Sequence, residues 1–166
     1  KQKKIIIALK IIIYSGCPGP IINARQHQKI IQHLQDAKSK GARVLLGEVQ
    51  ESEHYINPTV VCDINRDMLM EQEETFGPVV AISRYSNINE AIQRANDSSY
   101  GLGAVVYGNK EAEAVADQLE AGMIGINQGV GGSGDAPWVG AKQSGFGFHG
   151  SPEGHRQFAQ VRVVSC

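Results

Sequence analysis

A run of carboxylates ahead of an aromatic residue is the first feature of this sequence that could carry chemistry. Residues 71–78 have the sequence Glu-Gln-Glu-Glu-Thr-Phe-Gly-Pro, in which the Gly-Pro pair predicts a turn before an apolar strand. A carboxylate there can accept hydrogen bonds from a diol such as a ribose, and the Phe76 ring can present a flat apolar face to another ring. Taken alone, the run is better explained as a solvated acidic stretch with Phe76 in the core.

A second candidate is the glycine-rich loop from Asn127 to Trp138, which follows an expected strand. Ligand sites in open α/β sheets lie at the carboxyl ends of strands, so its place favours binding. The loop has neither a GxxxxGK[ST] nor a GxGxxG pattern, and no phosphate loop is predicted. A flexible connection remains an alternative, and Trp138 could line a pocket or fill the core.

A third stretch, Gly140–Gly150, is again rich in glycine, which indicates positive φ angles or close backbone packing. His149 within it could act as a general acid or base. Nothing in the sequence supplies a partner for its ring, so a structural or surface histidine is the better interpretation.

The cysteines and histidines predict no metal site, disulfide framework or nucleophile. Cys17, Cys62 and Cys166 are odd in number and widely spaced, and the five histidines form no HExxH pattern. Cys17 lies between Gly16 and Pro18 with no sequence context that would lower its pKa, and no serine lies in a GxSxG elbow. We therefore expect a reducing, intracellular compartment and place the protein in the cytoplasm.

The composition is that of a folded domain with no nucleic-acid partner. The chain has 166 residues, of which 42% are hydrophobic and 20% charged, with a formal net charge of -1. Such a chain is too apolar for intrinsic disorder and has no basic surplus to attract a nucleic acid.

Apolar periodicity predicts helices that alternate with short strands. Asn23 and Gly41 are expected to cap the ends of one helix, and Asn87 and Asn109 to start two more. Strands are expected at 42–46, 59–63, 79–85, 101–107, 123–126 and 160–165. This alternation indicates an α/β domain with an open, mostly parallel sheet flanked by helices.

The N-terminal segment, residues 1–18, is atypical. Its basic start and Ile-rich run imitate a signal peptide, but Lys10 interrupts the run, which is far shorter than the about 20 residues of a membrane span. We expect one or two β-branched strands here, with no membrane partner. The low complexity also suggests that the segment is foreign to the natural chain.

Seven stretches closely resemble, in order and separation, the C-terminal part of the catalytic domain of the aldehyde dehydrogenase superfamily. They are Gly19–Gln26, Lys40–Val44, Asn57–Val60, Glu73–Val79, Ala95–Leu102, Gly122–Asn127 and Ala136–Gly147. The resemblance covers nearly all of the chain from Gly19 onwards, and it reverses the weight given above to residues 71–78.

The resemblance implies an oxidoreductase that uses NAD or NADP to oxidise an aldehyde to an acid through a thioester on a cysteine. Glu74 is similar to the glutamate that binds the nicotinamide-ribose hydroxyls, and Phe76 to the aromatic residue near the nicotinamide. Asn127, Gln128 and Trp138 are similar to residues of the aldehyde entrance. Residues 160–165 resemble the terminal strand that pairs across a homo-oligomer interface.

The departures from the family pattern imply an incomplete catalytic apparatus. The family's nucleophilic cysteine, general-base glutamate, oxyanion-hole asparagine and dinucleotide-binding domain lie upstream of these stretches. Phe148-His149-Gly150 also replaces the Arg-Glu that commonly follows the Lys-x-Ser-Gly-x-Gly motif.

We therefore assign no catalytic residue and expect the chain alone to be inactive. The expected divisions are residues 1–18, a catalytic-domain portion at 19–158 and an oligomerisation strand at 159–166. The alternative is a non-catalytic, aldehyde-dehydrogenase-like module that serves assembly or channelling.

Overall fold

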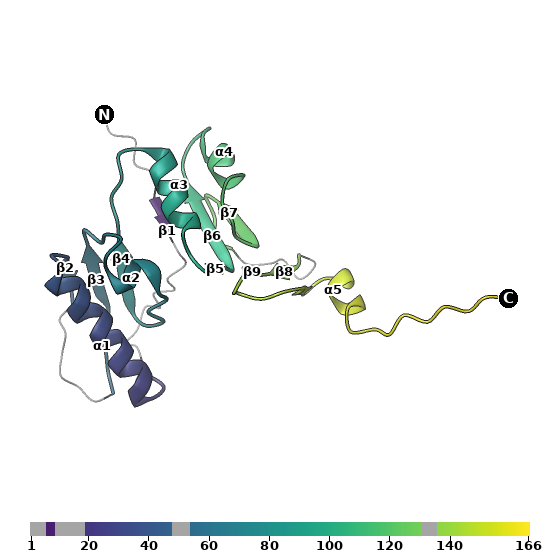
Figure 1. The fold of residues 1–166 in the computed structure, drawn as a ribbon, viewed down its shortest axis with the longest axis horizontal. Helices are drawn as coiled ribbons and strands as arrows, with labels where there is room; N and C mark the ends of the chain where they lie inside the picture. Colours follow the sequence, from purple (N-terminus) through teal and green to yellow (C-terminus); the bar gives the residue numbers. More distant parts are fainter. Residues whose placement is uncertain (1–5, 9–18, 48–53, 131–135) are drawn as a thin grey trace. The chain divides into compact units, whose positions relative to one another are not determined.

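The computed structural model describes residues 6–8, 19–47, 54–130 and 136–166, and it divides into two compact units (Figure 1). The first unit contains the described residues from Gly19 to Ile88. The second contains residues 6–8 and everything described from Asn89 onwards. Each unit is an α/β structure with its own sheets, and each is considered by itself.

The first unit is built around α1 (Ala24–Ser39), whose ends are where the sequence predicts them. The Asn23 side chain accepts a hydrogen bond from the backbone N–H of Gln26, and Gly41, with a φ of 95°, follows the C-cap. Ile30, Leu34 and Ala37 form the buried stripe of the helix.

This stripe packs into the core of the first unit, which also contains residues of its sheet. The strands are β2 (Arg43–Leu46), β3 (Thr59–Cys62) and β4 (Val79–Ile82), in that order. β3 and β4 run parallel, with α2 (Leu69–Gln72) between them in the chain, whereas β2 joins β3 antiparallel. Val61 and Val79 pack into the same cluster as Ile30 and Leu34.

The second unit has a similar strand–helix–strand arrangement at its centre. β6 (Gly103–Tyr107) and β7 (Met123–Ile126) are parallel, and α4 (Ala112–Ala116) lies between them in the chain. β1 (Ile6–Ala8) pairs antiparallel with the other edge of β6. α3 (Ile88–Asn96) begins at the boundary between the units and buries Ala91 and Ile92.

Two small ribbons complete the second unit. One pairs β5 (Tyr100–Gly101) with β9 (Ala141–Lys142), and the other pairs β8 (Trp138–Val139) with β10 (Phe148–His149). The last helix, α5 (Pro152–Arg156), is capped by the Ser151 hydroxyl, which accepts from the N–H of Gly154. Beyond α5 the chain is exposed to its end.

The expected α/β class is confirmed, but the described residues form small sheets in place of one open, mostly parallel sheet. The described residues form four sheets of two or three strands, and only β3–β4 and β6–β7 are parallel pairs. Two parallel strands need a crossover connection between them. In the described chain, α2 lies in the crossover from β3 to β4, and α4 lies in the crossover from β6 to β7. The strands added around them join antiparallel.

Three local expectations also need comment. Glu111, not Asn109, is the N-cap of α4, and Asn109 instead accepts from the N–H of Ala112 through its backbone oxygen. Residues 160–165 form no strand within the described chain, because nothing in it pairs with them. Of the Ile-rich segment, Ile6–Ala8 is a strand as expected, and the rest lies outside the described residues.

A glycine in β7 gives a test of this packing. A Cβ on Gly125 would lie 2.3 Å from the backbone oxygen of Gln128, whereas a Cβ on Gly129 would meet no atom of the described residues within 4 Å. We expect Gly125→Ala to lower the free energy of unfolding by about 1–3 kcal/mol, because a backbone atom has to move. Gly129→Ala, the matched control, should change it by less than about 0.5 kcal/mol in urea unfolding. Equal effects of the two variants would contradict the described turn.

Candidate functional site

The segment 73–77, which we call the acidic turn, connects α2 to β4 and presents its two predicted site residues to solvent. The Glu74 side chain is exposed, and Phe76 is 74% exposed. Phe76 also has a φ of 48°, in the left-handed region that is unfavourable for a side chain of its size. The interpretation that places Phe76 in the core is therefore wrong, because its ring points away from the packed side of the turn.

One face of α1 packs against the acidic turn. Gln26, Ile30 and His33 follow one another at i, i+4 and i+7, so they lie on the same side of the helix. The Gln26 Nε2 donates to the backbone oxygens of Thr75 and Phe76, at 2.8 and 2.9 Å. A Cβ on Gly77 would lie only 2.6 Å from Ile30 Cδ1, so this position leaves no space for a side chain.

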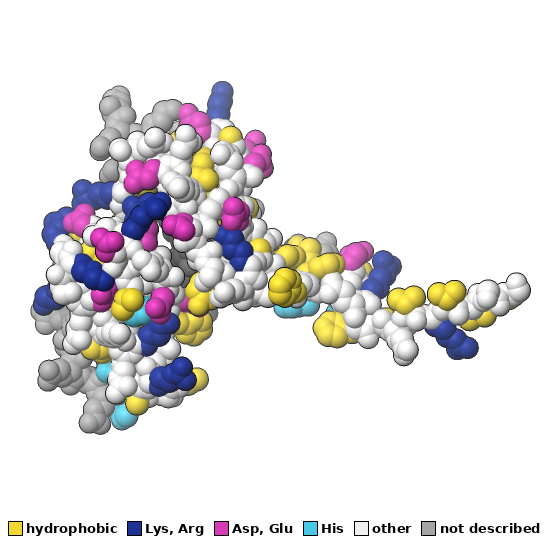
Figure 2. All heavy atoms as spheres, viewed as in Figure 1, with side chains coloured by type: hydrophobic (Ala, Val, Ile, Leu, Met, Phe, Trp, Pro, Cys, Tyr) yellow, Lys and Arg dark blue, Asp and Glu magenta, His cyan; other side chains and the backbone are white. Residues whose placement is uncertain are grey.

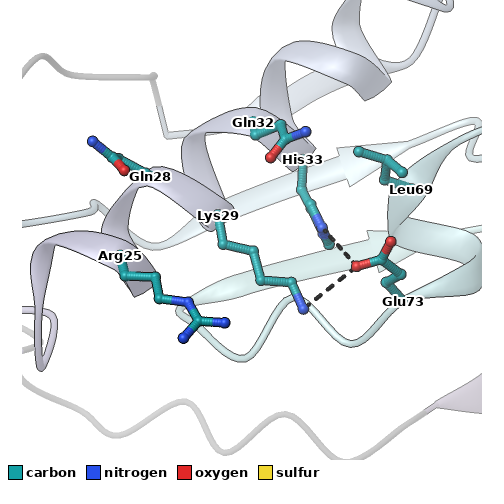
Figure 3. A pocket seen from close by; sticks show the side chains of 7 residues that line it. All are labelled: Arg25, Gln28, Lys29, Gln32, His33, Leu69 and Glu73. Atoms are coloured by element: carbon teal, nitrogen blue, oxygen red, sulfur yellow. Dashed lines mark ion pairs between the residues drawn. The ribbon is translucent and has the colours of Figure 1, made fainter.

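His33 is the buried polar residue of this contact, with an exposure of 1%. Its Nδ1 lies 3.0 Å from Thr75 Oγ1, and its Nε2 lies 3.6 Å from a carboxylate oxygen of Glu73. Lys29 Nζ approaches the same oxygen at 3.5 Å, and Figure 3 shows both side chains pointing from α1 toward Glu73. A carboxylate only accepts hydrogen bonds, so the neutral tautomer that suits both neighbours is the one with its proton on Nε2, which leaves Nδ1 to accept from the Thr75 hydroxyl.

Burial is the largest influence on the charge of this imidazole. It lowers the pKa of His33 below its ordinary value of 6.5, and the nearby Lys29 ammonium lowers it further. The carboxylates of Glu73 and Asp36 oppose both effects. The net direction is downward, so His33 is neutral at pH 7.

A groove of about 440 Å³ lies beside the acidic turn. Its lining residues come from α1, α2 and the start of the turn: Arg25, Gln28, Lys29, Gln32, His33, Leu69 and Glu73 (Figure 3). The lining is mostly polar and contains charges of both signs. It therefore suits a polar ligand with hydroxyl groups better than an apolar one.

In the second unit, Asn127 directly follows β7 and has a φ of 55°. Its side-chain oxygen accepts from the N–H of Gly108, and its Nδ2 donates to the oxygen of the same residue, both at 2.9 Å. This double contact ties the start of the glycine-rich loop to the end of β6. Gln128 is exposed at the start of that loop, and Val130 is buried again.

Trp138 lies on the β8–β10 ribbon with an exposure of 37%, which is too high for a core residue. Its indole stacks on the His149 imidazole opposite it, with ring centroids 6.4 Å apart and an interplanar angle of 22°. His149 is exposed, as expected of a surface histidine.

The structure thus brings Glu74 and Phe76 together on one turn of the first unit. Asn127, Gln128 and Trp138 belong to the second unit. Reasoning from sequence missed Gln26, Lys29 and His33 of α1, which contact the acidic turn, and Thr75 within the turn. For the three α1 residues, the available signal was their spacing beside the apolar stripe of the helix.

Three further features bear on function. Within the described ranges, no three His, Cys, Asp or Glu side chains are grouped closely enough to hold a metal ion. No helix in those ranges has the length and apolar character needed to cross a bilayer. Cys62 is a buried free thiol and Cys166 an exposed one, while Cys17 lies outside the described residues.

Comparison with known proteins gives one consistent result. The model of the aldehyde dehydrogenase family matches residues 17–164. A probable succinate-semialdehyde dehydrogenase [NADP(+)] from Sinorhizobium fredii is 40% identical over 150 residues, which make up 88% of this chain and 30% of that protein. The chain thus spans about 30% of the length of the curated relatives it matches.

Solved structures agree with the sequence match. An oxidoreductase from Marinobacter aquaeolei has a TM-score of 0.79 and 36% identity, covering 86% of this chain and 31% of its own. An indole-3-acetaldehyde dehydrogenase in complex with NAD+ has a TM-score of 0.76 and 33% identity, covering 86% of this chain and 30% of its own.

The state of His33 makes stability depend on pH. Its pKa is lowered in the folded chain, so the unfolded chain binds more protons as the pH falls through 6.5. The free energy of unfolding should therefore decrease as the pH falls through 6.5. His33→Gln should remove the contribution of His33 to this decrease. Denaturant unfolding at several pH values measures both slopes.

The exposed His155 supplies the control for that experiment. His155→Gln should keep the wild-type slope. A slope that is identical in the wild type and His33→Gln would contradict a buried, neutral His33.

Proposed function

Because this chain belongs to the aldehyde dehydrogenase family, we propose that it is the C-terminal portion of an NAD(P)-dependent enzyme that oxidises an aldehyde to a carboxylic acid. The observation that carries the proposal is the acidic turn, which presents Glu74 and Phe76 to solvent and whose first residue, Glu73, lines a polar groove. In this proposal, the nucleophilic cysteine and the dinucleotide-binding domain belong to polypeptide outside these residues.

In the proposed enzyme, Glu74 binds the nicotinamide-ribose hydroxyls and Phe76 packs near the nicotinamide ring. The fit is chemical: a carboxylate accepts from both hydroxyls of a diol, and an exposed phenyl ring offers an apolar face. NAD and NADP share this ribose, so both suit the turn. The bound cofactor would accept the hydride that the aldehyde loses, and the chain's own residues hold its nicotinamide end in place.

On the substrate side, we propose that the loop from Asn127 to Trp138 forms part of the aldehyde entrance. Both polar ends of the Asn127 amide contact Gly108, so this residue shapes the start of the loop. Gln128 and Trp138 are both exposed, and they would meet a small-molecule aldehyde.

We further propose a homo-oligomer that forms through residues 160–165. Val161 and Val163 are 87% and 86% exposed and alternate along the chain, and Figure 2 shows hydrophobic side chains along the segment after α5. An extended segment with this pattern suits pairing with a strand of a second copy. This feature alone would also fit a module for assembly or channelling, which has no need for an outward carboxylate on the acidic turn.

We place this enzyme in the cytoplasm and propose no nucleic-acid or membrane partner. The free thiols of Cys62 and Cys166 suit a reducing compartment.

Nicotinamide mononucleotide (NMN), which contains the nicotinamide and its ribose, tests the cofactor role of Glu74. In NMR titrations of this chain, we expect NMN to shift the backbone amides of Glu74 and Phe76. Glu74→Gln should weaken binding about tenfold, because hydrogen bonds to a charged acceptor are the stronger kind. Glu113→Gln, at an exposed glutamate of α4, should leave the affinity unchanged. Equal affinity in Glu74→Gln and the wild type would contradict the assignment.

A second prediction concerns activity. The purified chain should form no NADH or NADPH from aldehydes, because the reaction needs a nucleophile, base and oxyanion donors in one site. Sustained formation of reduced cofactor by the chain would overturn the proposed division of roles and make Cys17 the first candidate nucleophile.

A further inference from the structure

The contact between α1 and the acidic turn supports a role for two residues to which no function has been assigned. We propose that His33, acting through Thr75, is a positioning residue that sets the orientation of the acidic turn and thereby of Glu74 and Phe76. The inference rests on the proposed function, since it concerns how the cofactor-binding residues are presented.

Alternation along the turn is the first argument. Glu73 has extended dihedral angles, with φ -119° and ψ 146°, and successive side chains of an extended segment point to opposite sides. His33 faces both Glu73 and Thr75, at 3.6 and 3.0 Å. The side chains of residues 73 and 75 both contact α1, although Glu73 remains half-exposed, and the exposed side chain of Glu74 lies between them in the sequence.

Backbone strain at Phe76 is the second argument. A left-handed φ is unfavourable at a non-glycine residue, and it persists when its surroundings over-determine it. The flanking contacts do so here: Gln26 binds the backbone oxygens of Thr75 and Phe76, and Ile30 packs against Gly77. His33 supplies the contact to the side chain of Thr75, at the residue just before the strained one.

The protonation state of His33 is the third argument. In the neutral ring with its proton on Nε2, Nδ1 accepts from the Thr75 hydroxyl while Nε2 faces the Glu73 carboxylate. Protonation would make Nδ1 a donor and add a positive charge near Lys29. The charged groups that face this ring are Lys29 and Asp36 of α1 and Glu73 of the turn.

A matched pair of substitutions at Thr75 tests the proposal. Thr75→Val keeps the shape and removes the hydroxyl, whereas Thr75→Ser keeps the hydroxyl. Two measurements are made on each: the dissociation constant for NMN, and the 15N order parameters of the amides of residues 74–76.

Thr75→Val should weaken NMN binding about three- to tenfold, the effect of one lost hydrogen bond, and lower the order parameters of the turn. Thr75→Ser should stay within about twofold of the wild type. His33→Gln, a second variant at the other end of the contact, should follow Thr75→Val. Gln35→Ala, at an exposed position of α1, should match the wild type.

The two measurements separate failure of the inference from failure of the proposed function. If the wild-type chain bound no NMN, the cofactor role would fail, and lower order parameters in Thr75→Val alone would still support positioning. If Thr75→Val matched Thr75→Ser in both measurements, the proposal for His33 would be overturned. Loss of the folded spectrum in either Thr75 variant would also overturn it, because His33 would then serve stability alone.

Discussion

The packing of α1 against residues 73–77 is the constraint on which the candidate site depends. Gly77 has no space for a side chain because Ile30, itself part of the core, occupies it. The same helix face engages the turn through Gln26 and His33. The packing of α1 against the turn, which includes the core residue Ile30, therefore also fixes which side of the turn is exposed. Stability and ligand presentation therefore share the same interactions in this part of the molecule.

This arrangement explains why the residues of the acidic turn have different tasks. The side chains of Glu73 and Thr75 contact His33 of α1, although Glu73 remains half-exposed, whereas the exposed side chains of Glu74 and Phe76 face solvent. The glycine-rich loop shows a similar division: the Asn127 amide contacts the backbone of Gly108, and the next residue, Gln128, is exposed. In both places a strained, left-handed residue is held by hydrogen bonds from a neighbouring element.

The sequence predicted contacts between residues close together in the chain and missed contacts between residues far apart. The N-cap role of Asn23 involves a residue only three positions away, and that prediction is confirmed. The contact between His33 and Thr75 spans 42 positions, and no local pattern predicts it. The family resemblance, now supported over residues 17–164, identified the acidic turn but not the helix that holds it. The sequence also did not predict how the strands divide among small sheets, because the pairing of short flanking strands depends on contacts between residues distant in sequence.

The central claim is that α1 holds the acidic turn so that Phe76 and Glu74 face the nicotinamide and its ribose. Intermolecular nuclear Overhauser effects between NMN and the isotopically labelled chain test it most directly. The account predicts cross-peaks from the nicotinamide ring protons to the Phe76 ring and from the ribose protons to the Glu74 methylenes. Cross-peaks only to groups outside residues 73–77, or none at saturating NMN, would contradict it.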